Sequence, residues 1–334
     1  ADQFDHKGSG DLIQDHFQLI TFTKINELSI GLAGIDYLTK IRTQLKADID
    51  FNKKDKIFTL KENELQINQL ILSFAGSVRR SGEELVTDLK FKTNQNDLKS
   101  ILSLIPAIYQ KNIADINTSG QASLQGYLQG VYKENHYPAF HLQLSINDGM
   151  FQYPQSPAQV NDLNLHLVID NAGGILDNTL IDLDKFHAKV NQEPIDVTLH
   201  IKTPISDPYF SATAKGNINL YDIKNLIPLE QDVDLSGLIT SDLFIEGNLA
   251  SIEKNQYDKF QARGNLSFKE INYSGSAIPE KVTVQQANLE LKPEKVSLNF
   301  QALLVKIDVG ANGSLENVLP FLLKGQTLKG ILTL

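Results

Sequence analysis

Apolar and polar residues alternate one by one along much of this chain, and this pattern constrains the fold more than any other feature. Successive side chains of a β-strand project to opposite faces, so strict alternation predicts strands with one apolar and one water-facing side. The clearest runs are residues 140–146, 163–169, 195–201 and 296–300. Turn-forming Asn, Asp, Gly, Ser and Pro residues separate many of the runs. The pattern predicts a mainly β protein built as a long antiparallel meander.

Three short stretches have the spacing of apolar residues that is typical of a helix. They are residues 97–105, 221–227 and 315–319, and proline follows each of them. Proline lacks the N–H that an interior helical turn needs, so it ends a helix. We therefore expect a few short helices between the strands.

The first two of these stretches open an apparent internal repeat. Each precedes a strand pattern with two glycines ten residues apart, Gly120 and Gly130 in one copy and Gly237 and Gly247 in the other. Repeats of this kind stack along an axis and bury their faces against their neighbours. Two duplicated domains are the alternative. The predicted parts are an incomplete N-terminal β unit at 1–84, repeat units at 85–207 and 208–308, and a truncated third unit at 309–334.

The composition argues against several classes of function. A net charge of −9 without a basic cluster is unsuited to nucleic acid. The absence of cysteine excludes disulfides and thiolate metal sites. The seven histidines have no metal-binding spacing, and neither a nucleophile elbow nor a phosphate-binding loop occurs. We expect a protein that is not an enzyme, with no metal, no cofactor and no nucleic-acid partner.

The apolar sides of these strands allow two architectures. About twenty strands at ~4.8 Å spacing would make a sheet too long to stay flat, so it curls into a half-pipe or packs on itself as a sandwich. A half-pipe would offer an apolar groove suited to an acyl chain, because each buried CH₂ contributes ~0.8 kcal/mol. Alternation alone favours the sandwich and leaves the half-pipe as the alternative. The candidate groove residues are Phe140, Leu142, Leu144, Leu165, Leu167, Val197, Leu199, Leu298 and Phe300.

Several segments, in this order, resemble proteins of the AsmA family. They are residues 94–109 (NQNDLKSILSLIPAIY), 137–140 (YPAF), 149–154 (GMFQYP), 180–187 (LIDLDKFH), 202–208 (KTPISDP) and 235–237 (LSG). The likeness extends from about Gly10 to the end of the chain. No single segment carries a chemical signature, so the resemblance depends on their number and order.

The resemblance implies a periplasmic segment of a non-catalytic, lipid-conducting protein. Members of the family are typically tethered to the inner membrane by an N-terminal helix, which would lie outside this chain, because no apolar run here reaches the ~20 residues that span a bilayer. Their architecture is like that of bridge-like lipid transfer proteins, whose long curled β-sheets hold lipid tails in a groove. The implied partners are phospholipid acyl chains and membrane proteins of the inner and outer membranes. The alternative function is a closed β scaffold for outer-membrane protein assembly without lipid cargo.

The chain ends at residues 330–334 (GILTL), which have the pattern of the middle of a strand. We therefore expect it to be a piece of a longer protein.

Overall fold

The structure is a computed structural model that is mainly β, with antiparallel strands and a few short helices, as the alternation predicts. The chain divides into two compact units, residues 1–154 with 165–180, and residues 155–164 with 181–334. The described residues are 2–13, 15–32, 35–94, 97–104, 116–154, 156–226, 233–254, 256, 260–275, 278–292, 295–304, 307–315 and 329–333.

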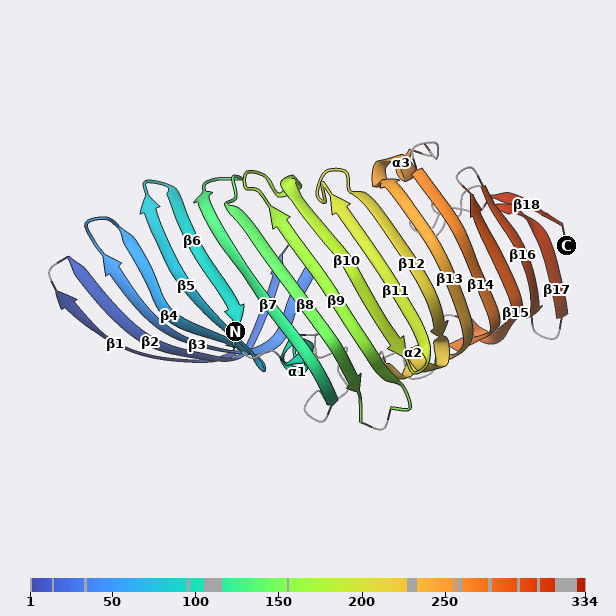
Figure 1. Cartoon of the computed structure of the whole chain (residues 1–334), viewed down its shortest axis with the longest axis horizontal. Helices are drawn as coiled ribbons and strands as arrows, with labels where there is room; N and C mark the ends of the chain where they lie inside the picture. The colour runs from blue at the N-terminus through green and yellow to red at the C-terminus, as the bar shows by residue number, and fades with distance from the viewer. Residues whose placement is uncertain are drawn as a thin grey trace. The chain divides into compact units, whose positions relative to one another are not determined.

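Unit 1 is an antiparallel meander in which each strand from β1 to β8 pairs with the next along the chain (Figure 1). The C-terminal part of β9 (Gln159–Asn171) and the 3₁₀ turn η3 (Leu176–Asn178) also belong to this unit. Its other elements are β1 (Asp2–Ile13), β2 (His16–Leu32), β3 (Ile35–Asn52), β4 (Ile57–Ile67), β5 (Leu70–Ser81), β6 (Glu84–Thr93), α1 (Leu98–Leu102), β7 (Asn117–Tyr132) and β8 (Ala139–Gln152).

Unit 2 repeats this arrangement, with each strand from β11 to β18 paired antiparallel to the next. The N-terminal part of β9 belongs to it, and so does β10 (Thr179–Val190) from residue 181 onward. The remaining elements are β11 (Glu193–Lys202), β12 (Tyr209–Asn219), α2 (Leu220–Leu226), β13 (Asp234–Asn248), α3 (Leu249–Glu253), β14 (Phe260–Gly275), β15 (Ile278–Lys292), β16 (Lys295–Leu304), β17 (Ile307–Leu315) and β18 (Gly330–Thr333).

Two of the three predicted helices are confirmed as α1 and α2. Asp97 caps the N-terminus of α1, and its carboxylate accepts hydrogen bonds from the Ser100 N–H at 2.8 Å and from the Ser100 hydroxyl at 2.7 Å. Such a cap satisfies backbone donors that have no partner within the helix. Of the third predicted helix, Leu315 is the last residue of β17, and residues 316–319 lie outside the described residues.

The strands at the start of unit 1 are bent, and their ladders are irregular. Register shifts interrupt the β2–β3, β3–β4 and β4–β5 ladders. In β4, Lys61 and Glu62 together face the single residue Ala75 of β5, which is a β-bulge. Figure 1 shows these strands curving along their length. Because a bulge increases local twist and bends its strand, these insertions account for the curvature.

The glycines of the apparent repeat have matching roles in the two units. Gly120 of β7 and Gly237 of β13 have φ angles of 101° and 117°, and each lies opposite a bulge in the next strand. A Cβ atom would lie 2.5 Å from the Asp148 carbonyl oxygen at the first glycine and 2.7 Å from that of Glu270 at the second. Only glycine allows this close approach of two backbones. The boundaries of the repeat units themselves stay a prediction.

Candidate functional site

The paired strands of unit 1 separate apolar from polar side chains. Residues directly opposite one another in an antiparallel ladder project to the same face, and Phe51 lies opposite Phe58, which lies opposite Val78. Parallel rows of the same kind extend from β2 to β8, and we call this side the apolar face of unit 1. Its members include Leu19, Leu45, Ile49, Phe51, Phe58, Leu60, Leu65, Leu72, Phe74, Val78, Leu89, Phe91, Leu124, Leu128, Phe140, Leu142 and Leu144.

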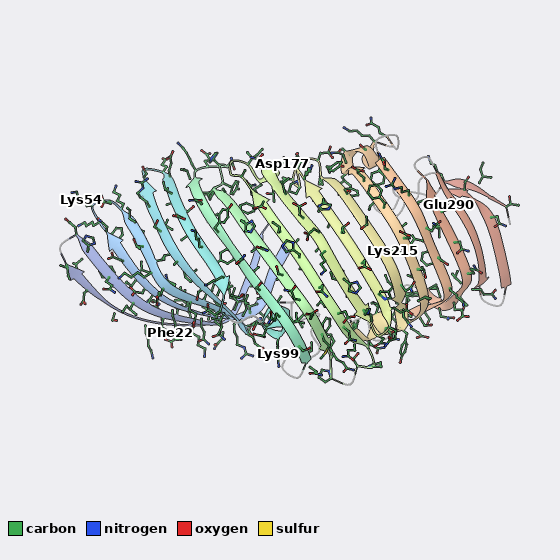
Figure 2. The ribbon with its side chains drawn as sticks, viewed as in Figure 1. Phe22, Lys54, Lys99, Asp177, Lys215 and Glu290 are labelled. Atoms are coloured by element: carbon green, nitrogen blue, oxygen red, sulfur yellow. The ribbon has the colours of Figure 1, made fainter. Side chains whose placement is uncertain are left out.

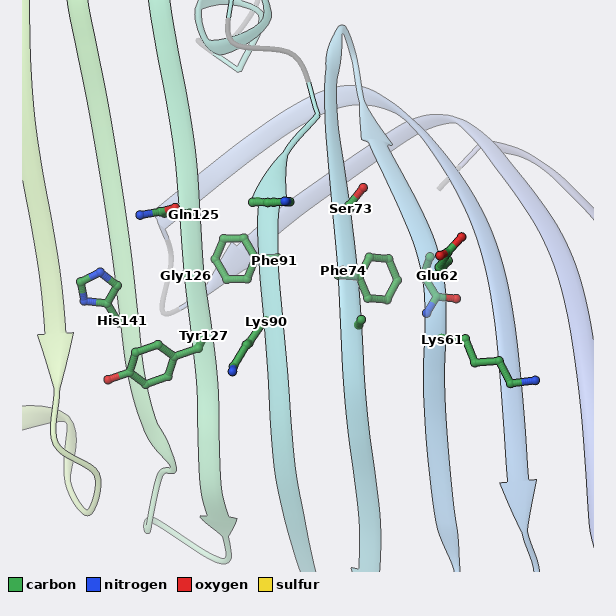
Figure 3. A pocket seen from close by; sticks show the side chains of 13 residues that line it. Lys61, Glu62, Ser73, Phe74, Lys90, Phe91, Gln125, Gly126, Tyr127 and His141 are labelled. Atoms are coloured by element: carbon green, nitrogen blue, oxygen red, sulfur yellow. The ribbon is translucent and has the colours of Figure 1, made fainter.

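Glycines in these rows bring aromatic rings close to the backbone. Phe74 of β5 lies opposite Phe91 of β6, which lies opposite Gly126 of β7 (Figure 3). The Phe91 ring occupies the space beside Gly126, where a Cβ atom would lie only 2.6 Å from Cζ of the ring. An aromatic ring that covers a strand glycine shields its backbone from water and stabilises the ladder.

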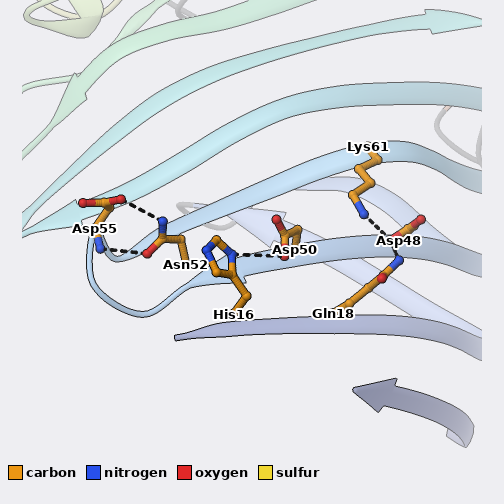
Figure 4. Close-up of polar contacts among 7 residues, drawn as sticks. All are labelled: His16, Gln18, Asp48, Asp50, Asn52, Asp55 and Lys61. Atoms are coloured by element: carbon orange, nitrogen blue, oxygen red, sulfur yellow. Dashed lines mark hydrogen bonds and ion pairs between the residues drawn. The ribbon is translucent and has the colours of Figure 1, made fainter. Parts of the chain in front are cut away.

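The opposite side of the same strands carries charges and amides. Lys46 forms an ion pair with Glu64 at 2.9 Å. Asp48 accepts a hydrogen bond from Gln18 at 3.2 Å and lies 3.7 Å from the Lys61 ammonium (Figure 4). Further rows on this side hold Ser73, Lys90, Lys92, Gln125, Tyr127, His141 and Gln143. We call this side the polar face of unit 1. Figure 2 shows the side chains of the described residues along the strands.

The apolar face of unit 1 is covered at one end and partly exposed elsewhere. Leu70 is 1% exposed and Leu72 is 9% exposed on β5, which α1 contacts. Phe74, Leu142 and Leu144 are only partly buried. Among the described residues of unit 1, the closest backbone contacts join each strand to its ladder neighbours and to α1.

Five of the predicted groove residues lie in unit 1, and they share its apolar face. Phe140, Leu142 and Leu144 lie on β8 opposite Leu128, Gly126 and Leu124. Leu165 and Leu167 lie on β9, where the neighbouring His166 bonds Gln143 at 3.0 Å and Asp170 bonds His141 at 2.7 Å. Both of those bonds lie on the polar face, so strand alternation directs Leu165 and Leu167 to the apolar face.

The other four predicted groove residues lie in unit 2. Val197 and Leu199 of β11 are opposite Ala214 and Ala212, and the same row continues through Leu243. Leu298 and Phe300 of β16 are opposite Leu289 and Ala287. The side chains of Leu298 and Phe300 lie outside the described residues. Whether all nine residues line one groove stays a prediction.

Unit 2 buries part of its own apolar side. Phe260 is 2% exposed and Ala262 7% exposed, and Phe210, Ile245 and Leu291 pack against them. The rings of Phe210 and Phe260 lie 5.6 Å apart between centroids. Burial of rings and aliphatic side chains stabilises this part of the sheet.

The sequence reasoning missed most of the apolar face contributed by β2 to β6. Phe58, Phe74, Leu89 and Phe91 lie in the same rows as the predicted residues of β8. The signal was present, because residues 85–93 read Leu, Val, Thr, Asp, Leu, Lys, Phe, Lys, Thr, with an apolar residue or threonine at each odd number.

Two ionisable groups of unit 2 have shifted pKa values with evident causes. A hydrogen bond from Lys189 at 2.7 Å, together with its charge, holds the pKa of the Asp162 carboxyl below its usual value. The Tyr209 hydroxyl donates a hydrogen bond to the Glu246 carboxylate, and this bond raises the pKa of Tyr209. Both pairs join side chains of different strands, Asp162 of β9 with Lys189 of β10 and Tyr209 of β12 with Glu246 of β13.

The described residues contain no group of three or more His, Asp or Glu side chains suited to holding a metal ion. None of the described helices is long and apolar enough to cross a membrane. Comparisons with protein-family models, with curated proteins and with solved structures find no match for this chain.

Proposed function

We propose that this chain is a non-catalytic lipid-binding protein whose apolar faces hold acyl chains. The observation that carries the proposal is the apolar face of unit 1, which runs from β2 to β8 and on which Phe74, Leu142 and Leu144 are only partly buried. Apolar surface of this extent is costly to leave in water, and on a monomer it marks a site of interaction.

The dimensions of this face suit a lipid tail. Seven strands, β2 to β8, at ~4.8 Å spacing span about 29 Å across the ladder. The hydrocarbon core of a bilayer is ~30 Å thick, so one tail is about 15 Å long. If ten methylenes leave water at ~0.8 kcal/mol each, the gain is about 8 kcal/mol, which corresponds to roughly micromolar affinity before the entropic costs of binding. The apolar face of unit 1 thus has room for an entire tail.

The bulged and bent strands of unit 1 and the resemblance to the AsmA family support a finer proposal. In it, the sheet is a curled half-pipe that forms a groove in the periplasm, and a helix outside this chain tethers the protein to the inner membrane. The groove conducts phospholipid for outer-membrane assembly and envelope lipid homeostasis. Its protein partners are proteins of the inner and outer membranes. The main alternative, a closed scaffold without lipid, is less well supported because Phe74, Leu142 and Leu144 are partly exposed.

The proposal is tested by asking whether lipid stays with the protein. We expect native mass spectrometry of the chain, purified without detergent, to reveal bound phospholipid. The double substitution Leu142→Asp and Leu144→Asp places two charges on the apolar face and should abolish the bound lipid, because a carboxylate cannot be buried under an acyl chain without a partner.

A matched control changes the same strand on its other side. Ser145→Asp with Asn147→Asp adds the same charge to β8 on the polar face and should leave bound lipid unchanged. Circular dichroism checks that both variants fold. Wild-type protein free of lipid, even after incubation with phospholipid vesicles, would refute the proposal, and so would equal lipid loss in both folded variants.

A further inference from the structure

A cavity of about 640 Å³ lies in unit 1, against β4 to β8 (Figure 3). On β5, β6 and β7 it touches three consecutive residues of each strand, namely 73–75, 90–92 and 125–127. The outer two members of each triplet project to the polar face, while the middle members, Phe74, Phe91 and Gly126, belong to the rows of the apolar face. The cavity therefore opens on the polar face, on the other side of the sheet from the proposed acyl site.

Positive charge concentrates at this cavity. Lys90 and Lys92 project from β6 into its lining, and both are exposed. Neither ammonium has an ion-pair partner among the described residues, whereas Lys61, at the β4 side of the cavity, lies 3.7 Å from Asp48. Glu62 is the one carboxylate among the lining residues that the structure describes. Two cations that are not already neutralised favour an anionic group as ligand.

The remaining lining supplies an aromatic surface and amides. The rings of Tyr127 and His141 stack with centroids 5.5 Å apart and an interplanar angle of 11°, and Tyr127 is 36% exposed. Gln125 lies beside them and donates a hydrogen bond from its amide to Gln143 at 2.9 Å. A flat ring surface next to amide donors and acceptors suits a polyhydroxylated ring, which has apolar C–H faces and a rim of hydroxyl groups.

The cross-strand register brings these features within reach of one small molecule. Lys90 lies directly opposite Tyr127, which lies directly opposite His141. Lys92 lies directly opposite Gln125 in the adjacent row of the same face. Neighbouring strands are ~4.8 Å apart, so one molecule of the size of a hexose can contact the ring stack and a lysine together.

We propose that this cavity binds an anionic carbohydrate, a sugar ring that carries a phosphate or a carboxylate. The ring lies against Tyr127 and His141, Gln125 bonds its hydroxyl groups, and Lys90 and Lys92 bind its anionic group. The same chemistry is offered by a soluble sugar phosphate and by a lipid headgroup such as that of phosphatidylinositol. The site is independent of the proposed acyl site, because it uses the opposite face.

Isothermal titration calorimetry with glucose 6-phosphate, glucose and inorganic phosphate tests the soluble form of the ligand. We expect glucose 6-phosphate to bind more tightly than either fragment. Lys90→Gln with Lys92→Gln should weaken its binding about tenfold or more, the scale of losing charge-assisted hydrogen bonds. Tyr127→Ala should weaken binding of glucose 6-phosphate but leave the affinity for phosphate unchanged.

Lys53→Gln with Lys54→Gln is the matched control. It removes the same charge from exposed lysines in the turn between β3 and β4, outside the cavity, and should leave binding unchanged (Figure 2). A second arm measures sedimentation of the protein with phosphatidylcholine vesicles that contain phosphatidylinositol, and compares Lys90→Gln with Lys92→Gln against this control.

Binding in the calorimetry alone identifies a soluble sugar phosphate as the ligand. Vesicle binding that Lys90→Gln with Lys92→Gln abolishes, without binding in the calorimetry, identifies a lipid headgroup. Absence of binding in both arms would overturn the proposal. So would equal binding by the cavity variant and the control, or affinity for inorganic phosphate equal to that for glucose 6-phosphate. The double variant Leu142→Asp with Leu144→Asp should still bind glucose 6-phosphate at the cavity. Loss of ligand binding at the cavity and loss of acyl binding on the opposite face can therefore be told apart.

Discussion

Leu70 and Leu142 belong to the same face of unit 1 but differ in what covers them, and this difference predicts two different stabilities on truncation. Leu70 begins β5 and is 1% exposed, on a strand that α1 contacts. Leu142 lies in the middle of β8 and is only partly buried. If the apolar face is open, alanine at these two positions removes the same atoms from unlike surroundings.

Leu70→Ala should behave as a core substitution and cost about 2.7–5 kcal/mol of unfolding free energy, because the lost contacts are followed by a cavity. Complete burial of a leucine is worth about 1.5–3 kcal/mol, and Leu142 achieves only part of this. Its truncation leaves no enclosed cavity, so Leu142→Ala should cost about 1 kcal/mol. The expected difference between the two variants is therefore about 2 kcal/mol.

Urea unfolding followed by circular dichroism measures both variants against the wild type. With a slope of about 2 kcal/mol per molar urea, a 2 kcal/mol difference separates the two midpoints by roughly 1 M. The measurement uses lipid-free protein, because bound lipid would stabilise the folded state by mass action. Equal losses of about 3 kcal/mol at both positions would mean that Leu142 lies in a closed core, and the open-face argument would be refuted.

Three further predictions concern single positions and are measured by the same unfolding assay. Gly76→Ala should destabilise by at least 1–3 kcal/mol, because φ is 139° there and an added Cβ would overlap the backbone of β6; a loss below about 0.5 kcal/mol would contradict this geometry. Asp97→Ala removes the cap of α1 and should cost about 1 kcal/mol, whereas Asp97→Asn, which keeps a capping oxygen, should cost much less. Asp162→Asn should lower stability at neutral pH, where the ionised carboxylate bonds Lys189. Because the pKa of Asp162 is depressed, this contribution is present above the ordinary carboxyl pKa of ~3.9 and vanishes as the pH falls through the lower folded value; a wild-type advantage that persists in strong acid would contradict it.

Local patterns of the sequence predicted the elements and the orientation of their side chains. The alternation in residues 140–146 predicts both the strand β8 and the shared face of Phe140, Leu142 and Leu144. The helical spacing of the apolar residues in 97–105, with proline after it, predicts α1. These predictions succeed because strand alternation and helical spacing depend on residues a few positions apart.

Registers and bulges could not be read from the same patterns. The pairing of Phe91 with Gly126 joins residues 35 positions apart, and many other alignments of β6 and β7 would also match apolar with apolar residues. The bulge at Lys61 and Glu62 is equally hidden, because an inserted residue of β4 is defined only against its partner in β5. The position of Lys90 and Lys92 beside Tyr127 and Gln125 on the polar face depends on these registers too.

The sequence by itself determined that the chain forms strands with one apolar side, and that a few short helices interrupt them. Only the tertiary structure decided what lies against that apolar side in unit 1. There, α1 contacts β5, on which Leu70 is almost fully buried, whereas Leu142 on β8 is only partly buried. The physical reason is that period-two alternation is the same for a strand in a sandwich and for a strand in an open sheet, because it records only which side avoids water. What replaces the water is set by contacts between distant parts of the chain or with another molecule.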